Sequence, residues 1–138
     1  MRKLTTIEQA NADVLGDAAL FHVTGTILNK NIQDCNAAIR DLLKREGVID
    51  YAELEPGDKV TLEGVYSDGT ETTISAYRAK TRGDKRIWFN SLKNHAEAGD
   101  IMALVIRGGK LVIQNVTKGV AVAVFAIPAL DTMARMTF

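Results

Sequence analysis

Residues 80–113 read KTRGDKRIWFNSLKNHAEAGDIMALVIRGGKLVI, and this stretch decides the fold class. It contains a basic loop, a short polar segment and three short apolar runs separated by turn residues. The runs are 86–89, which begins with Arg86, 101–106, and 111–116, which continues beyond the quoted stretch; the turns are Gly99-Asp100 and Gly108-Gly109. Short apolar runs bounded by such residues are typical of consecutive β-strands. The stretch therefore predicts a meander of strands.

The residues on either side extend this pattern. Further strands are expected at 19–23, 59–66, 71–77 and 120–127, the last being apolar enough to be covered on both faces. An amphipathic helix is expected around 37–43, with Asp34 or Asn36 as its N-cap and Gly47 as its stop, and a second from Asn90 or Ser91 through Ala98. Together they predict a mainly β domain with short α-helices, arranged as a closed or nearly closed barrel.

The chain of 138 residues has the size of one domain, and we expect 1–138 to be a single unit. Residues 1–10 contain no apolar targeting segment. The longest apolar run, 119–130, is broken by Pro128 and is too short for a membrane span. The single cysteine, Cys35, excludes an internal disulfide framework and a cysteine-rich zinc site. We therefore expect a cytoplasmic protein that does not contact a membrane.

The sequence lacks the common catalytic patterns. His22 and His95 lie in different expected elements, and neither has a second ligand at metal-binding spacing. We expect His22 to be structural, His95 to be solvated or to lie at a helix end, and Cys35 to be a half-buried apolar residue. No acidic residue stands two positions before a lysine, as common metal-dependent nucleases require. We expect no catalytic residue, no metal and no cofactor.

Charge is segregated along the chain, although the formal net charge is zero. Residues 46–71 contain eight acidic side chains and one basic side chain, whereas residues 78–93 contain six basic side chains and one acidic side chain. Such a run is often only a solvated face. A concentrated pole nevertheless attracts ligands of the opposite sign even when the net charge is zero. The basic pole therefore indicates an anionic partner.

The basic pole has the chemistry of a DNA-reading loop. In an extended segment alternate residues share one side, so we expect Lys80, Arg82 and Asp84 to form one row, followed by Lys85 and Arg86. Arg and Lys donate to guanine, a carboxylate accepts from cytosine, and further bases hold phosphates. The alternative is that Asp84 caps the turn or pairs with Arg82 or Lys85. Because aromatic residues are few, the sequence gives little support to stacking on single-stranded bases.

The order of features in residues 80–113 resembles the DNA-binding pseudobarrel family, and within it the B3-like effector or specificity domains of restriction endonucleases. The features are the basic loop, Arg86-Ile87-Trp88-Phe89, a short helix ending in Ala98-Gly99-Asp100, an apolar strand, Gly108-Gly109-Lys110 and another apolar strand. The likeness covers about residues 18–127. It implies an open DNA-binding pseudobarrel of about seven strands.

The resemblance also implies a binding mode, because members of this family grip the major groove of double-stranded DNA with two protruding arms. By position, the C-terminal arm comprises Lys80, Arg82, Asp84, Lys85 and Arg86. The N-terminal arm is an exposed loop between the first strand and the helix, with Thr26, Asn29, Lys30 and Asn31 as candidates. The family's nuclease domain has no counterpart in this sequence. The resemblance thus implies either the recognition domain of a type II restriction endonuclease or a stand-alone DNA-binding protein, binding as a monomer.

Two other functions are compatible with the sequence. A dimeric swapped-hairpin transcription regulator or antitoxin shares part of the same skeleton and would bind a symmetric operator. A protein-interaction module would instead dock a basic partner on the acidic segment 46–71. Charge reversal at Glu53 and Glu63 is expected to abolish partner binding in that case and to leave DNA binding unchanged in the first.

Overall fold

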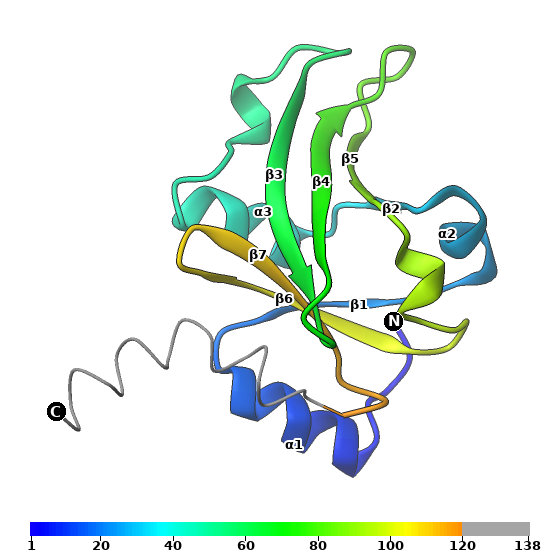
Figure 1. Cartoon of the computed structure of the whole chain (residues 1–138). Coiled ribbons are helices and arrows are strands. Elements are labelled where there is room, and N and C mark those ends of the chain that lie inside the picture. The colour runs from blue at the N-terminus through cyan, green and yellow to red at the C-terminus, as the bar shows by residue number, and fades with distance from the viewer. Residues whose placement is uncertain (120–138) are drawn as a thin grey trace, which may run out of the picture.

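A computed structural model describes residues 1–119, and the expected strand at 120–127 lies outside the described residues. Seven strands form one curled sheet in the order β1-β6-β7-β3-β4-β5-β2 (Figure 1). The strands are β1 (Ala19–His22), β2 (Ile32–Asp34), β3 (Lys59–Tyr66), β4 (Glu71–Arg78), β5 (Lys85–Phe89), β6 (Ile101–Arg107) and β7 (Lys110–Asn115). The helices are α1 (Thr6–Leu15), α2 (Gly25–Lys30) and α3 (Ala37–Arg45), and 3-10 turns cover Tyr51–Glu53 and Leu92–Asn94. The expected mainly β, open-barrel fold is confirmed.

The sheet consists of two halves that meet at one short parallel pairing. Strands β1, β6 and β7 form one antiparallel half, and β3, β4, β5 and β2 form the other. Residues Gly64–Tyr66 of β3 pair in parallel with Leu111–Ile113 of β7. At Gly64 a Cβ atom would lie 2.2 Å from Ile74 Cδ1 and 3.0 Å from the Leu111 carbonyl oxygen. Ile74 belongs to the same half as Gly64 and Leu111 to the other, so the absence of a side chain at residue 64 leaves room both for Ile74 and for the approach of β7.

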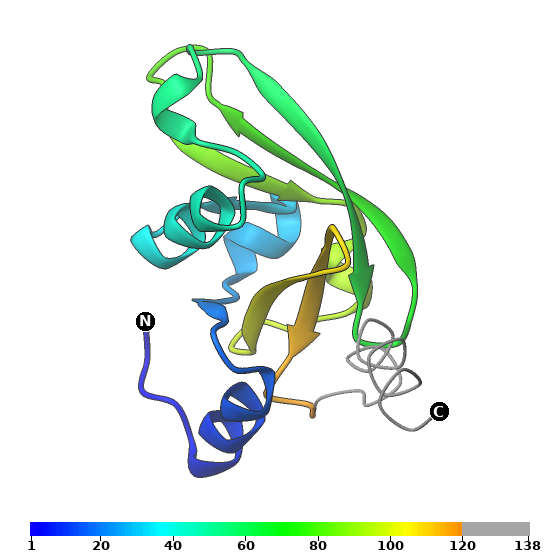
Figure 2. The same ribbon diagram turned by 90° about the vertical axis from the view of Figure 1, so that its left-hand side faces the viewer.

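Helix α3 fills the open side of the curled sheet, as its amphipathic pattern predicts. Asn36 caps the helix by accepting a hydrogen bond from the backbone N–H of Ile39 at 2.9 Å. The same side chain donates to the Leu20 carbonyl at 3.0 Å, which links the region after β2 to the opposite edge strand β1. Figure 2 shows the helix between the two halves of the sheet, and its buried side chains belong to the main core. These are Ile39, Leu42 and Leu43.

Helix α1 covers the other face of β6 and β7, and it was not expected from the sequence. Its Ala12 and Leu15 pack on a second cluster that includes Ile101 and Val105. Since the opposite face of β6 lies in the main core, the apolar run 101–106 is explained by burial on both faces. The available signal was a capping box, in which Thr5 and Glu8 each bond the backbone N–H of the other.

Two other expectations about local structure are wrong. The helix expected through Ala98 is only the 3-10 turn Leu92–Asn94, because Ser91 has a left-handed backbone and caps nothing with its side chain. The exposed loop expected before α3 instead contains α2 and β2. Thr24 caps α2 by accepting from the Ile27 N–H, and Asn31 ends it in the left-handed conformation. Asn and Thr are frequent in loops, which is why the sequence predicted one, but both residue types also cap helices, as they do here.

The close approach at Gly64 yields a stability prediction. Gly64→Ala is expected to lower the free energy of unfolding by about 1–3 kcal/mol, because the new methyl group must displace Ile74 and press on the Leu111 carbonyl. Urea denaturation measures this change. Gly25→Ala is the matched control, since a Cβ atom there meets nothing within 4 Å. Equal stability of the two variants would contradict the proposed packing constraint.

A second prediction concerns Glu8, a buried carboxylate that anchors α1. The hydrogen bond from Arg2 lowers the pKa of Glu8; burial opposes it, and Thr117 and the Thr5 N–H lower it further. A pKa below that of the unfolded chain contributes stability above pH ~4.5, which is lost as the pH falls. Glu8→Gln is expected to destabilise by about 2 kcal/mol at pH 7.

The difference between wild type and Glu8→Gln should therefore shrink as the pH is lowered from ~5 towards 3. Thermal and urea unfolding across this range measure it. The exposed Glu46→Gln is the control and should change stability little at any pH. A difference that stays constant with pH would show that the charge of Glu8 is not what stabilises the fold.

Candidate nucleic-acid interface

The basic loop between β4 and β5 is a tight turn rather than the expected extended segment. The Ala79 N–H donates to the Asp84 carbonyl, and the Gly83 N–H donates to the Ala79 carbonyl, both at 2.8 Å. Gly83 has a φ of +72° that glycine tolerates readily. The extended conformation from which the row of Lys80, Arg82 and Asp84 was predicted is therefore wrong, although Arg82 and Asp84 contact each other.

Arg78 builds the base of this turn and is not available to a ligand. Its Nε donates to the Gly83 carbonyl at 2.9 Å, and its Nη1 donates to the Leu54 carbonyl at 2.7 Å. One side chain thus joins the end of β4, the basic turn and the segment before β3. A Cβ atom at residue 83 would lie 2.5 Å from Arg78 Nη2. Part of the positive charge seen in the sequence is therefore structural.

A cluster of ion pairs continues from the turn onto β5 and β2. Asp84 Oδ2 accepts from Arg82 at 3.1 Å and from Arg86 at 3.0 Å, and Arg86 Nε bonds Asp34 at 3.1 Å. Although partial burial lowers the pKa of Arg86, its hydrogen bonds to Asp34 and Tyr77 and the charges of both aspartates raise the pKa overall. The pairing of Asp84 with Arg82, one of the alternatives considered from the sequence, is present. Arg86 is held in place by two carboxylates.

The two expected arms meet at a groove on the outer face of the sheet. Its volume is about 390 Å³. It is lined by Thr24, Thr26, Ile27, Lys30, Ile32, Gln33, Asp34 and Arg86. Helix α2 supplies Thr26 and Lys30, and β5 supplies Arg86, because β2 pairs with β5 so that Asp34 lies opposite Arg86. These three predicted residues are thus brought together.

The remaining predicted residues are arranged differently. Lys80 and Lys85 are exposed and form no ion pair within residues 1–119, and Asn29 is exposed on α2 without lining the groove. Asn31 is only partly accessible. Its backbone carbonyl accepts from the Phe89 N–H, and its side-chain Oδ1 is buried without a hydrogen-bond partner in the described chain. Of the proposed N-terminal arm, Asn31 is the residue least able to reach a ligand.

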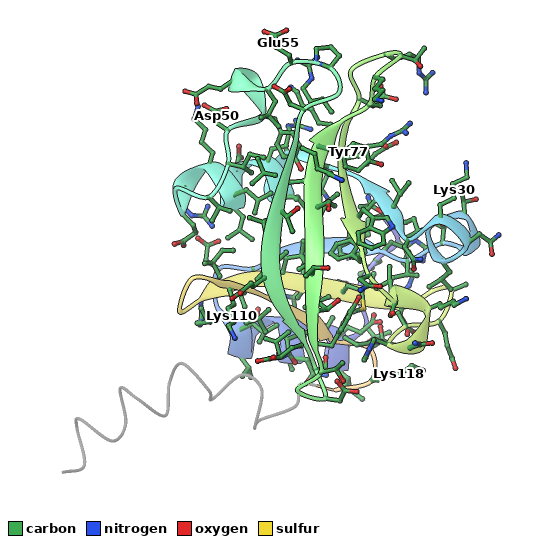
Figure 3. The ribbon with its side chains drawn as sticks, turned by 45° about the horizontal axis from the view of Figure 1, so that its top comes forward. Lys30, Asp50, Glu55, Tyr77, Lys110 and Lys118 are labelled. Carbon is green, nitrogen blue, oxygen red and sulfur yellow. The ribbon has the colours of Figure 1, made fainter. Side chains whose placement is uncertain are left out.

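An acidic turn lies directly beside the basic turn. The Gly57 N–H donates to the Arg78 carbonyl at 2.8 Å, and the Arg78 N–H donates to the Asp58 carbonyl at 3.1 Å. Glu53 and Glu55 are exposed here. Glu55 stands at the tip of the molecule in Figure 3, with Lys30 on α2 to the side. The acidic segment 46–71 does not form one face, because its other end is the hairpin after β3.

The outer face of β3, β4 and β5 carries residues that were not predicted. Lys59, Ser75, Tyr77 and Trp88 line a second hollow of about 320 Å³. The alternation within each strand was readable from the sequence, but the register that brings the three strands together was not. No motif marks these residues as a group.

The His and Cys side chains of residues 1–119 are the candidate ligands or nucleophiles considered from the sequence. No cluster of His, Cys, Asp or Glu there can hold a metal ion. Burial raises the pKa of the Cys35 thiol to about 11, which disfavours a thiolate nucleophile. His95 stacks on Tyr66 with ring centroids 3.7 Å apart, and its Nδ1 lies 3.6 Å from Asp68. Of the two alternatives predicted for His95, the solvated side chain is wrong and the position at a helix end is confirmed, because His95 is the C-cap of the 3-10 turn Leu92–Asn94.

No family model, no curated protein and no solved structure matches the chain. Among the helices within residues 1–119, none combines the length and apolar character needed to cross a membrane.

The base of the basic turn can be tested by Gly83→Ala. We expect a loss of about 2–4 kcal/mol in unfolding free energy, because the methyl group strains the backbone and pushes Arg78 from its two carbonyl partners. Gly108→Ala is the matched control, because it has a φ of +58° but open space around the Cβ position. Gly108→Ala should lose only about 1 kcal/mol of unfolding free energy, the cost of placing alanine in a left-handed backbone conformation.

A double variant separates the two contributions. In Arg78→Ala/Gly83→Ala the methyl group no longer displaces the guanidinium, so the combined loss should be smaller than the sum of the single losses. Additive losses would contradict the coupling between Gly83 and Arg78.

Proposed function

We propose that this chain binds a short sequence of double-stranded DNA through the major groove, without cleaving it. In this proposal it acts in the cytoplasm as a monomeric B3-like recognition domain that works with the nuclease domain of a restriction endonuclease. The binding surface comprises the turn at 79–84, the outer end of β5 and helix α2. The observation that carries the proposal is the groove where Thr26 and Lys30 of α2 face Arg86 of β5.

The side chains on this surface divide into two groups. Lys30, Lys80 and Lys85 are exposed ammonium groups, suited to phosphates. Arg82 and Arg86 are guanidinium groups aligned by Asp84, and Arg is the residue best suited to guanine. An exposed ion pair is worth about 0–1 kcal/mol, whereas a bidentate guanine contact is worth about 1–3 kcal/mol. Arg82 can therefore leave Asp84 for a guanine at little net cost.

The neighbouring acidic turn restricts how DNA approaches. Glu53 and Glu55 repel phosphates at the acidic turn, so we expect DNA to approach mainly from the side of β5 and α2. This arrangement also weakens sequence-independent attraction, which depends on the number of phosphates neutralised. A neutral protein with a local cationic surface is then expected to bind DNA selectively. Its affinity for DNA should be low at high salt.

The main alternative is a dimeric transcription regulator or antitoxin of the swapped-hairpin type. Sedimentation with and without DNA distinguishes the two. A dimer that requires a symmetric operator would overturn the monomeric proposal.

The proposal predicts different effects for two neighbouring residues. Arg82→Ala should cost about 1–3 kcal/mol on the preferred sequence and relax specificity at one base pair, because it removes a base contact. Lys80→Ala should weaken the binding of all DNA sequences equally, because it removes a phosphate contact. For the same reason the slope of log affinity against log salt concentration should become less steep by about 1. Mobility shift of a randomised duplex pool, followed by titration of the retained sequence, measures both.

Lys3→Ala is the charge-matched control, since Lys3 is exposed on the N-terminal segment outside the proposed surface. It should leave affinity and the salt slope nearly unchanged. If no sequence is retained from the pool at low salt, the proposed function is wrong. If Lys3→Ala weakens DNA binding as much as Lys80→Ala does, the proposed location of the DNA-binding surface is wrong.

A further inference from the structure

Tyr77 and Trp88 are the two aromatic residues within 1–119 that do not belong to the core. The other four, Phe21, Tyr51, Tyr66 and Phe89, are buried in the main cluster. Tyr77 and Trp88 are partly exposed on the outer face of the sheet. Figure 3 shows Tyr77 on this face between the acidic tip at Glu55 and Lys30 on α2. Large aromatic groups left open beside a hollow indicate a binding surface.

Strand register brings four different side chains around this hollow. Lys59 of β3 lies opposite Tyr77 of β4, and Ser75 of β4 lies opposite Trp88 of β5. The hollow has a volume of about 320 Å³, within the range of small-ligand sites. It is continuous with the proposed DNA surface, because Arg86 and Trp88 alternate with the buried Ile87 and Phe89 on the same strand.

We propose that the hollow between Tyr77 and Trp88 receives one unpaired nucleobase of the bound DNA. The inference rests on the proposed function and adds a second mode of recognition to it. The aromatic rings supply faces on which a base stacks. The Ser75 hydroxyl can donate to or accept from the base edge. The Lys59 ammonium, the single basic group of residues 46–71, supplies a contact for the adjoining phosphate.

The charge around the hollow selects an anionic ligand. An aromatic site is also suited to a methylated ammonium group. Lys59 lines this hollow, however, and none of the described residues that line it is acidic, so a cationic side chain would be repelled. A nucleotide satisfies both features, because its base is a flat π system and its phosphate is negative. A base in a DNA strand and a free mononucleotide share this chemistry. The two are distinguished by comparing the affinity of the protein for each.

Access of a base to the hollow depends on its pairing. Taking a paired base out of the stack costs a few kcal/mol, and this cost is smallest when the base has no partner. We therefore expect DNA with one unpaired base to occupy the hollow more readily than a fully matched duplex of the same sequence. The basic turn and α2 then hold the flanking duplex.

The chain contains one tryptophan, so its fluorescence reports directly on Trp88. Three probes are compared: a matched duplex, the same duplex with one thymine opposite an abasic site, and thymidine monophosphate. We expect the abasic duplex to quench Trp88 strongly and to bind several-fold more tightly than the matched duplex. Thymidine monophosphate at the same concentration should quench little, because it lacks the duplex contacts.

Variants of Tyr77 separate stacking from folding. Tyr77→Ala should weaken binding of the abasic duplex roughly 5- to 100-fold, whereas Tyr77→Phe should retain most of it, because the ring remains. Ile7→Ala is the control, since it removes an apolar side chain that is 70% exposed on α1, outside the hollow. Its affinity and quenching should match those of the wild type.

Unchanged Trp88 emission at saturation with the abasic duplex would overturn this inference, while normal binding of the matched duplex would leave the proposed function standing. Quenching by thymidine monophosphate as strong as that by the abasic duplex would also overturn the assignment to DNA. Quenching by single-stranded oligonucleotide, without binding of any duplex, would instead overturn the proposed function and support the base site.

Discussion

The close approach of β3 to β7 at Gly64 is the constraint on which the rest of the structure depends. The three parallel pairs Gly64–Leu111, Val65–Val112 and Tyr66–Ile113 join the two antiparallel halves of the sheet. Strand β3 also pairs along its whole length with β4, so its path fixes the direction of the β4–β5 turn. The basic turn and the aromatic hollow are thus positioned from a contact that lies far from both.

Much of the strand pattern could be predicted from the sequence, because it depends on local alternation and turn chemistry. The runs 59–66, 71–77 and 101–106 were bounded by Pro-Gly, Asp-Gly and Gly-Gly turns, and the observed strands agree within one residue. The helices were harder to predict from the sequence. Helix α3 has a strong amphipathic stripe and was predicted, whereas α1 buries only Glu8, Ala12 and Leu15, which form no apolar stripe.

The candidate site was only partly predictable, for a physical reason. Residue type indicated cationic groups at 80–86, but the sequence does not show which of them the fold itself uses. Arg78 is bound to two backbone carbonyls, and Arg86 is held by two aspartates, one of which comes from β2. The hollow at Trp88 depends on the pairing of three strands. Partners that come from distant segments are not encoded in local spacing.

Strand β5 contributes both to the core and to the proposed binding surface, because its side chains alternate between the buried and the outer face of the sheet. Ile87 and Phe89 are fully buried, and Phe89 stacks on Phe21 with centroids 5.4 Å apart. The Arg86 carbonyl also accepts a hydrogen bond from the buried Tyr51 hydroxyl at 2.8 Å. The backbone that presents Arg86 and Trp88 is therefore fixed from the core side. Side chains held in this way lose little conformational entropy when a ligand binds, so a small surface can be selective.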